Sequence, residues 1–235
     1  MRPVLYLIPV TLGDNEPEAV LPKTVKTIAD SLTVFIVENV RTARRFLIKL
    51  GITTPIDDLT FFELNKHTLA SEISKFLDPM KEGKSIGVMS EAGVPGVADP
   101  GAQVVRLAHL QGYVVQPLVG PSSILMALMA SGMNGQSFTF HGYLPINPNQ
   151  RVHTLHQLEK LSKNHNQAQI FMETPYRNQK LLEDIFKACQ PDTMLCIAVD
   201  ITLETEKIVT KPIGQWKKSK PDIHKRPAVF VLQRG

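Results

Sequence analysis

Hydrophobic and polar positions alternate along the first half of the chain as short apolar runs separated by amphipathic segments. Five runs rich in β-branched or aromatic residues predict strands, at residues 4–10, 32–38, 60–64, 86–90 and 113–118. The intervening segments repeat apolar residues at helical spacing and predict helices, at about residues 22–30, 41–50, 68–80 and 101–111. Strands and helices that alternate at this spacing form a parallel sheet with helices on both faces. The first half is therefore expected to be an α/β domain.

The second half begins with a break rich in Pro, Gly and Ser, and it ends in closely spaced strands. An apolar helix is predicted at residues 124–132, with Ser122 or Ser123 as its N-cap. A Pro-rich loop holds Pro145 and Pro148, and helices follow at about residues 151–163 and 175–189. The predicted strands are residues 137–143, 168–172, 194–200, 208–210 and 227–232. We therefore expect two α/β domains, an N-terminal parallel-sheet domain at residues 1–116 and a C-terminal mixed-sheet domain at residues 117–235.

Several classes of protein are excluded by pattern and composition. The opening apolar run contains Pro3 and Pro9 and continues into acidic residues, unlike a signal peptide, and no later apolar stretch is uninterrupted enough to span a membrane. Cys189 and Cys196 have neither disulfide-framework nor zinc-site spacing. The chain also has no Walker loop and no GxGxxG motif. We expect a cytoplasmic protein with reduced thiols, no membrane segment and no metal site.

Positive charge is concentrated in two places. Residues 211–235 carry a net charge of +6, against −2 for the rest of the chain. Such a segment attracts polyphosphate, although a solvated tail would have the same composition. Arg41, Arg44 and Arg45 recur at helical spacing and share one face, which is typical of a phosphate-binding surface or of a solvated helix.

Two loops have the composition of ligand-binding segments. The first, SEAGVPGVADPG at residues 90–101, connects a buried strand to a helix. Ligands of open α/β sheets lie beyond the carboxyl ends of the strands, and glycines there let backbone approach the ligand. From spacing alone, a tight turn in which Asp99 caps the next helix is the favoured interpretation, because glycine-rich turns are common. The second loop, GPSS at residues 120–123, offers free N–H groups at a helix start, which can hold an anion or simply be capped.

The order of the motifs along the chain resembles one family. SEAGVPGVADPG, GPSSILMALMASGM, FTFHGYLP and ETPYRN are similar to the motifs of the tetrapyrrole methylase superfamily, and most of all to the 16S ribosomal RNA 2′-O-ribose methyltransferases. The segments ENVRTARRFLIKLGI and ELNKHT extend the match over about the whole chain. The resemblance implies two α/β domains, S-adenosylmethionine in a cleft between them, and usually a homodimer.

The resemblance also implies roles for particular residues. The expected cofactor contacts are mostly backbone and small side chains, at Pro9, Ala92, Gly93, Val94, Pro95, Ser122, Ser123, Met172 and Ala198. The expected partner, ribosomal RNA or the small ribosomal subunit, would be bound by Arg41, Arg44, Arg45, Lys217, Lys218 and Lys220. A ribose hydroxyl must also lose its proton to a base. The candidate acids are Glu38, Glu91, Asp99 and Glu173, and the sequence does not choose among them.

The chain departs from the family pattern at several positions. Asn39 and Glu91 stand where the family usually has Asp, and Val199 and Leu203 stand where it usually has Arg and Lys. The first loop reads IPVTLGDN where TPIGNL is usual. Because these positions belong more to the acceptor side than to the cofactor side, two alternatives remain. One is a methyltransferase acting on a tetrapyrrole or another non-RNA acceptor, and the other is a non-catalytic RNA-binding paralogue.

Overall fold

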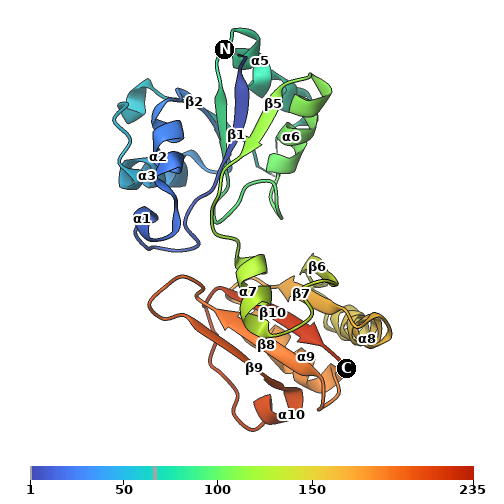
Figure 1. The fold of residues 1–235 in the computed structure, drawn as a ribbon. Helices are drawn as coiled ribbons and strands as arrows, with labels where there is room; N and C mark the ends of the chain where they lie inside the picture. Colours follow the sequence, from blue (N-terminus) through green and yellow to red (C-terminus); the bar gives the residue numbers. More distant parts are fainter. Residues whose placement is uncertain (1, 66–67) are drawn as a thin grey trace. The chain divides into compact units, whose positions relative to one another are not determined.

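The computed structural model describes residues 2–65 and 68–235 and divides the chain into two compact units, Met1–Ser122 and Ser123–Gly235 (Figure 1). The predicted division followed residue 116. The observed one comes later because the Leu118 N–H still donates to the Leu7 carbonyl at 3.0 Å, which extends the pairing of the sheet. Part of the ELNKHT motif, residues 66–67, lies outside the described residues.

The N-terminal unit is a five-stranded sheet in the order β3-β2-β4-β1-β5, and every pairing in it is parallel, as predicted. Its strands are β1 (Val4–Ile8), β2 (Val34–Val37), β3 (Thr60–Glu63), β4 (Ile86–Met89) and β5 (Val114–Pro117). All residues of β2 and β4 are buried, because helices cover both faces of the sheet (Figure 1). This burial explains why these two strands are continuous apolar runs.

Helices of the N-terminal unit pack in two groups. Those of the first group, α2 and α3, bury Val25, Ala29 and Leu47 against one face, and those of the second bury Met80 and Val104 against the other. The helices are α1 (Pro17–Val20), α2 (Lys23–Asp30), α3 (Val40–Leu50), α4 (Ala70–Ile73), α5 (Asp78–Lys81) and α6 (Gly101–Leu110), with 3-10 turns at Ile56–Asp58 and Ser74–Leu77.

The predicted continuous helix at residues 68–80 is wrong. The structure has three short pieces there, α4, a 3-10 turn and α5. Pro79 stands in the first turn of α5, and since proline lacks the N–H that a helix interior needs, it favours a new start over continuation. The pattern also does not predict α1, a single turn too short to show periodicity.

The C-terminal unit is a mixed sheet in the order β6-β7-β10-β8-β9, as predicted. Its one parallel pair is β6 with β7, and the other three pairs are antiparallel. The strands are β6 (Phe138–Tyr143), β7 (Ala168–Met172), β8 (Met194–Val199), β9 (Lys207–Pro212) and β10 (Ala228–Gln233). Consequently β6, β7 and β8 end at one edge, the edge at which β10 begins.

Helix α7 (Ser123–Ser131) packs on β8, β9 and β10, whereas α8 (Pro148–His165) and α9 (Asn178–Ala188) share a core with Phe171 and Phe230. A single turn, α10 (Ile213–Trp216), was not predicted. Helix α8 starts at Pro148 and not at residue 151, because the Asn147 side chain accepts hydrogen bonds from the next backbone N–H groups. Within the described residues, no helix is long and apolar enough to cross a membrane.

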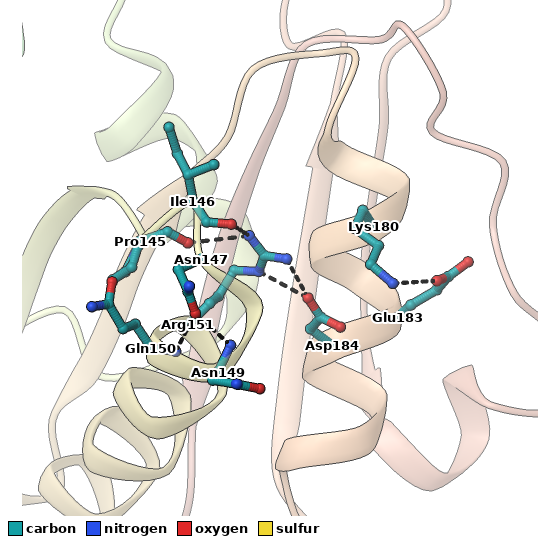
Figure 2. A network of polar contacts seen from close by, with 9 residues as sticks. All are labelled: Pro145, Ile146, Asn147, Asn149, Gln150, Arg151, Lys180, Glu183 and Asp184. Carbon is teal, nitrogen blue, oxygen red and sulfur yellow. Dashed lines mark hydrogen bonds and ion pairs between the residues drawn. The ribbon is translucent and has the colours of Figure 1, made fainter.

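A buried ion pair between Arg151 and Asp184 joins α8 to α9 (Figure 2). Their side chains are only 4% and 5% exposed. The Arg151 Nη1 atom also donates to the carbonyl groups of Pro145 at 3.1 Å and Ile146 at 2.9 Å. A buried charge needs such compensation on all sides. The network thereby fixes the turn that leads from the end of β6 into α8.

Candidate functional site

The carboxyl ends of β1 and β4 mark the point where the chain changes direction across the N-terminal sheet. β1 connects through α2 to β2 on one side, and β4 connects through α6 to β5 on the other. The strands β1 and β4 are themselves neighbours. Ligands of open α/β sheets bind in the crevice at such a switch point. The loops that follow Ile8 and Met89 therefore lie where a ligand of such a sheet is expected to bind.

Three of the predicted ligand-binding segments meet at this point. The Val10 N–H donates to the Gly93 carbonyl at 2.9 Å. A Cβ atom on Gly93 would lie 3.1 Å from the Pro121 carbonyl oxygen, and one on Gly120 would lie only 2.2 Å from the Pro9 side chain. The approach at Gly120 leaves no room for a Cβ atom, and the one at Gly93 is tighter than most real Cβ contacts. The structure thus brings Pro9, Gly93 and the segment before Ser122 together.

Gly93 also has a backbone conformation that favours glycine, with φ of +72°. Beside this loop, an apolar cavity of about 760 Å³ is lined by Val94 and Pro95 together with side chains of β1, β5 and α6. Cavities of several hundred Å³ with apolar walls are typical of small-ligand sites. The predicted residues Val94 and Pro95 therefore line a space large enough for a nucleoside, within the N-terminal unit alone.

Three of the four candidate acids lie together beyond the ends of β2 and β4. Burial raises the pKa of Glu38, and the nearby carboxylates of Asp99 and Glu91 raise it further. Burial also raises the pKa of Asp99, although backbone N–H groups oppose this. Since like charges are held close to one another, at least one of these carboxyl groups is poised to bind a proton more tightly than usual.

The contacts of these acids differ. The Asp99 carboxylate accepts from the N–H groups of Gly96 at 2.8 Å and Gly101 at 2.7 Å, so it shapes the loop and the start of α6 in the way the capping interpretation predicted. The exposed Glu91 accepts a hydrogen bond from the Thr42 hydroxyl at 2.6 Å. This leaves Glu38 and Glu91 as the carboxylates with capacity for a further partner.

The fourth acid, Glu173, lies in the C-terminal unit, and its carboxylate already has hydrogen-bond partners. Its Oε1 atom accepts from the Thr174 N–H at 2.7 Å and from Arg177 Nη2 at 2.6 Å. The hydrogen bond to Glu173 raises the pKa of Arg177. Three other atoms of this corner, Glu173 Oε2, Arg177 Nε and Asn178 Oδ1, are buried without a hydrogen-bond partner among the described residues. Glu173 is therefore a poor candidate for the base.

The remaining predicted cofactor residues belong to the C-terminal unit. Met172 and Ala198 both stand opposite Val229, one on each side of β10. Residues directly opposite on neighbouring strands project from the same face of a sheet. The neighbours of Val229 along β10, Ala228 and Phe230, belong to the core under α8 and α9, so this row faces the α7 side. Ser123 is the first residue of α7.

The predicted cations fall into paired and unpaired groups. Arg44 pairs with Asp57. Arg41 and Arg45 are exposed and form no ion pair with a described residue. Lys217, Lys218 and Lys220 are exposed directly after α10. The arginine face of α3 thus offers two uncompensated charges and not three. No group of three or more His, Cys, Asp or Glu suited to a metal ion occurs in residues 2–65 and 68–235.

Two residues that position candidate site residues could not be identified from the sequence. Thr42 positions Glu91, although the two are far apart in the chain, and Val229 aligns Met172 with Ala198. Asn39, a departure from the family pattern, caps α3 by accepting from the N–H groups of Arg41 and Thr42. Asn and Asp cap helices about equally well, so this departure preserves the local structure.

Known proteins resemble this chain over nearly its whole length. The family described as Tetrapyrrole (Corrin/Porphyrin) Methylases has a model that matches residues 4–217. The Ribosomal RNA small subunit methyltransferase I of Xylella fastidiosa is 33% identical over 226 residues, which are 94% of this chain and 76% of that protein. The protein of the same name in Vibrio cholerae is 29% identical over 236 residues, 99% of this chain and 77% of that one. The crystal structure of the methyltransferase CobJ shares the fold, with a TM-score of 0.64, 17% identity, and coverage of 100% of this chain and 95% of that one.

Proposed function

The chain belongs to the tetrapyrrole (corrin/porphyrin) methylase family and is an S-adenosylmethionine-dependent methyltransferase, and we propose that its acceptor is a ribose 2′-hydroxyl of small-subunit ribosomal RNA. The observation that carries the cofactor site is the meeting of three loops at the switch point of the N-terminal sheet, where Gly93 and Gly120 approach backbone and Pro9. Its similarity to ribosomal RNA small subunit methyltransferases supports the RNA acceptor.

The residues present fit this cofactor. When bound, it supplies a methyl group carried on a positively charged sulfur. The apolar cavity beside Val94 and Pro95 suits an adenosyl group. Backbone carbonyl groups of the converging loops, such as that of Pro121, suit a positive charge better than a side-chain cation would. The N–H groups at the start of α7, beside Ser123, suit a carboxylate.

A hydroxyl that accepts a methyl group must give up its proton, and Glu38 and Glu91 are the residues we assign to take it. Asp99 is occupied by backbone N–H groups, and Glu173 by Arg177. Glu91 is exposed and held by Thr42, whereas Glu38 is partly buried with a raised pKa. Replacing each by Gln distinguishes the two. Replacement of the residue that is the base should lower the rate about a hundredfold or more and abolish the acidic limb of the rate profile against pH.

Calorimetry tests the cofactor site. Gly93→Val places a side chain against Leu12 and Pro121, and should weaken S-adenosylhomocysteine binding at least tenfold, about 1.4 kcal/mol. Gly83→Val is the matched control. It has the same kind of backbone, with φ of +83°, and nothing within 4 Å of the added Cβ. Equal affinities in the two variants would place the cofactor elsewhere.

Methyl transfer from labelled S-adenosylmethionine tests the acceptor. Small ribosomal subunits from a strain lacking the gene should accept label at one ribose, and that linkage should resist alkali because the 2′-hydroxyl is blocked. Label that appears only in a small molecule from a metabolite extract would support the tetrapyrrole alternative. Binding of ribosomal RNA without transfer would support a non-catalytic RNA-binding paralogue.

The cations that we expect to bind RNA are testable as a group. Neutralising Lys217, Lys218 and Lys220 together should weaken RNA binding. The slope of the logarithm of the binding constant against the logarithm of salt concentration should become shallower by up to about three. The affinity for S-adenosylhomocysteine should not change. An unchanged salt slope would remove this segment from the RNA-binding surface.

Two further parts of the proposal concern assembly and location. We expect a homodimer, since Leu125 and Met129 are both exposed one turn apart on α7, and contiguous exposed apolar side chains are typical of an interface. Light scattering should then report about twice the chain mass of 26.1 kDa. A strictly monomeric mass would contradict it. Because ribosomal subunits are the proposed substrate, the cytoplasm is the expected location.

A further inference from the structure

Two exposed tyrosines lie where β6 and β7 end in the C-terminal unit. Tyr143 is the last residue of β6 and stands opposite Met172, and its side chain is 55% exposed. Tyr176 follows β7 in the turn before α9 and is 73% exposed. Tyrosine is enriched at binding interfaces, where its ring is in apolar contact and its hydroxyl stays in water. Neither residue belongs to the cofactor set or to the cation set described above.

A cationic group lies over one of these two rings. The Lys225 ammonium lies over the ring of Tyr176, 5.9 Å from its centroid. A cation over one face of a ring engages the quadrupole of that ring and leaves the opposite face available for stacking. The exposed ring of Tyr176 therefore lies beside a positive charge.

Hydrogen bonds hold the Tyr176 turn and the Lys225 loop together. The Lys225 N–H donates to the Pro175 carbonyl at 3.0 Å, and the Asn178 side chain donates to the Arg226 carbonyl at 2.6 Å. The backbone of Lys225 has φ of +58°, a conformation that costs energy for a lysine. This turn and this loop are therefore ordered before any ligand arrives, which reduces the entropy lost on binding.

Two acids at this edge are already paired with arginines. Glu173 is bonded to Arg177, and Asp200 is bonded to Arg226 at 2.7 Å. Lys225 forms no ion pair with a described residue. The same is true of the exposed lysines shortly before it in the chain, which are Lys217, Lys218 and Lys220. A run of uncompensated lysines thus leads along the chain to an exposed aromatic ring.

We propose that Tyr176, assisted by Tyr143, is a stacking platform for unpaired bases of the acceptor RNA, with Lys225 meeting an adjoining phosphate. The inference rests on the proposed RNA acceptor and adds the residues that engage its bases. Every nucleobase has a face that stacks on an aromatic ring, and unpaired RNA is recognised chiefly in this way. A polyanion without bases would engage the cations but not the rings.

Binding of a short single-stranded RNA oligonucleotide tests the platform. Tyr176→Ala should weaken RNA binding about tenfold, whereas Tyr176→Phe should stay within about twofold of the wild type, because stacking needs the ring and not the hydroxyl. Phe138→Ala is the matched control. Phe138 is a 39% exposed aromatic residue at the opposite end of β6, and its loss should not change RNA affinity.

Salt dependence separates the lysine from the ring. Lys225→Gln should lower the salt slope of RNA binding by about one unit, and Tyr176→Ala should leave that slope unchanged. Lys163→Gln, at an exposed lysine in the last turn of α8, should alter neither affinity nor slope. Heparin binding should be insensitive to Tyr176→Ala. An equal loss of RNA and heparin binding on Tyr176→Ala would overturn stacking as its role.

The failure of this inference differs from failure of the proposed function. If Tyr176→Ala binds RNA as tightly as the wild type while both methylate ribosomal subunits, the platform is wrong and the RNA acceptor stands. If the wild type neither binds RNA nor transfers methyl groups to ribosomal subunits, both are overturned. All variants should keep wild-type affinity for S-adenosylhomocysteine, which shows that they are folded.

Discussion

The two units differ in what lines the carboxyl edges of their sheets. In the N-terminal unit the edge is mostly backbone, with Gly93 and Gly120 allowing loops to approach within contact distance. In the C-terminal unit the edge is mostly side chains, with Tyr176 exposed and Lys225 above it. A backbone site can keep its shape while side chains change. A side-chain site changes with each substitution, and Val199 and Leu203, two of the departures from the family pattern, lie in this second unit.

The units also differ in where their charges lie. The ion pairs among the described residues of the N-terminal unit, such as Arg44 with Asp57, involve largely exposed carboxylates. The C-terminal unit buries Arg151 with Asp184. Buried pairs are costly to break, whereas exposed pairs contribute little. Substitutions of charged residues should therefore have unequal effects in the two units.

The largest expected effect comes from breaking the buried pair. Arg151→Met leaves the Asp184 carboxylate buried and uncompensated, and should lower the free energy of unfolding by about 3–5 kcal/mol. The fluorescence of Trp216, the single tryptophan, reports the C-terminal unit in urea unfolding. Lys180→Met, which removes the neighbouring exposed pair with Glu183 (Figure 2), should cost less than about 1 kcal/mol. Equal losses would contradict the distinction between buried and exposed charge.

The next largest effect is expected at the backbone edge of the N-terminal unit. Gly120→Ala places a Cβ 2.2 Å from Pro9, forces the two segments apart, and should cost about 1–3 kcal/mol of stability. It should also weaken S-adenosylhomocysteine binding. Gly135→Ala, where nothing lies within 4 Å of the added Cβ, is the control for adding a methyl group. Unchanged stability and affinity in Gly120→Ala would mean that the close approach is dispensable.

A smaller effect is expected from Glu38, and it depends on pH. Because the folded state raises the pKa of Glu38, ionisation there opposes folding, and this cost appears as pH rises through the raised pKa. Glu38→Gln should therefore raise the free energy of unfolding near pH 7 by about 0.5 kcal/mol or less, and leave it unchanged below about pH 4. Glu18→Gln, at an exposed acid, provides the reference. A gain that is the same at both pH values would contradict the assigned cause.

The smallest expected effect concerns the two cysteines, which should not be alkylated in the native protein. Burial raises the pKa of the Cys189 thiol to about 12, and Cys196 is buried as well. Because the thiolate is the reactive form, neither thiol should react with iodoacetamide at pH 8 unless the C-terminal unit unfolds. Mass spectrometry should find both labelled in urea and neither in the native protein. Native labelling would show that this core opens more readily than its packing indicates.

Much of the fold follows from local pattern. All ten predicted strands form, because β-branched runs bounded by turns carry their own signal, and the parallel and mixed sheets agree with prediction. Errors occur where local signals compete. Pro79 divides a predicted helix, and Asn147 with Pro148 starts α8 earlier than the apolar spacing suggests.

The sequence by itself determined the two α/β units, the glycine-containing loops that we propose for the cofactor site, and the family. These depend on neighbouring residues, such as the succession of Gly93, Val94 and Pro95, whose meaning is local. The tertiary structure alone decided which acids cluster, that Thr42 holds Glu91, and that Lys225 lies over Tyr176. The physical reason is strand order and register. They bring together residues that are distant in the chain, and no short stretch of sequence records which strands will be neighbours.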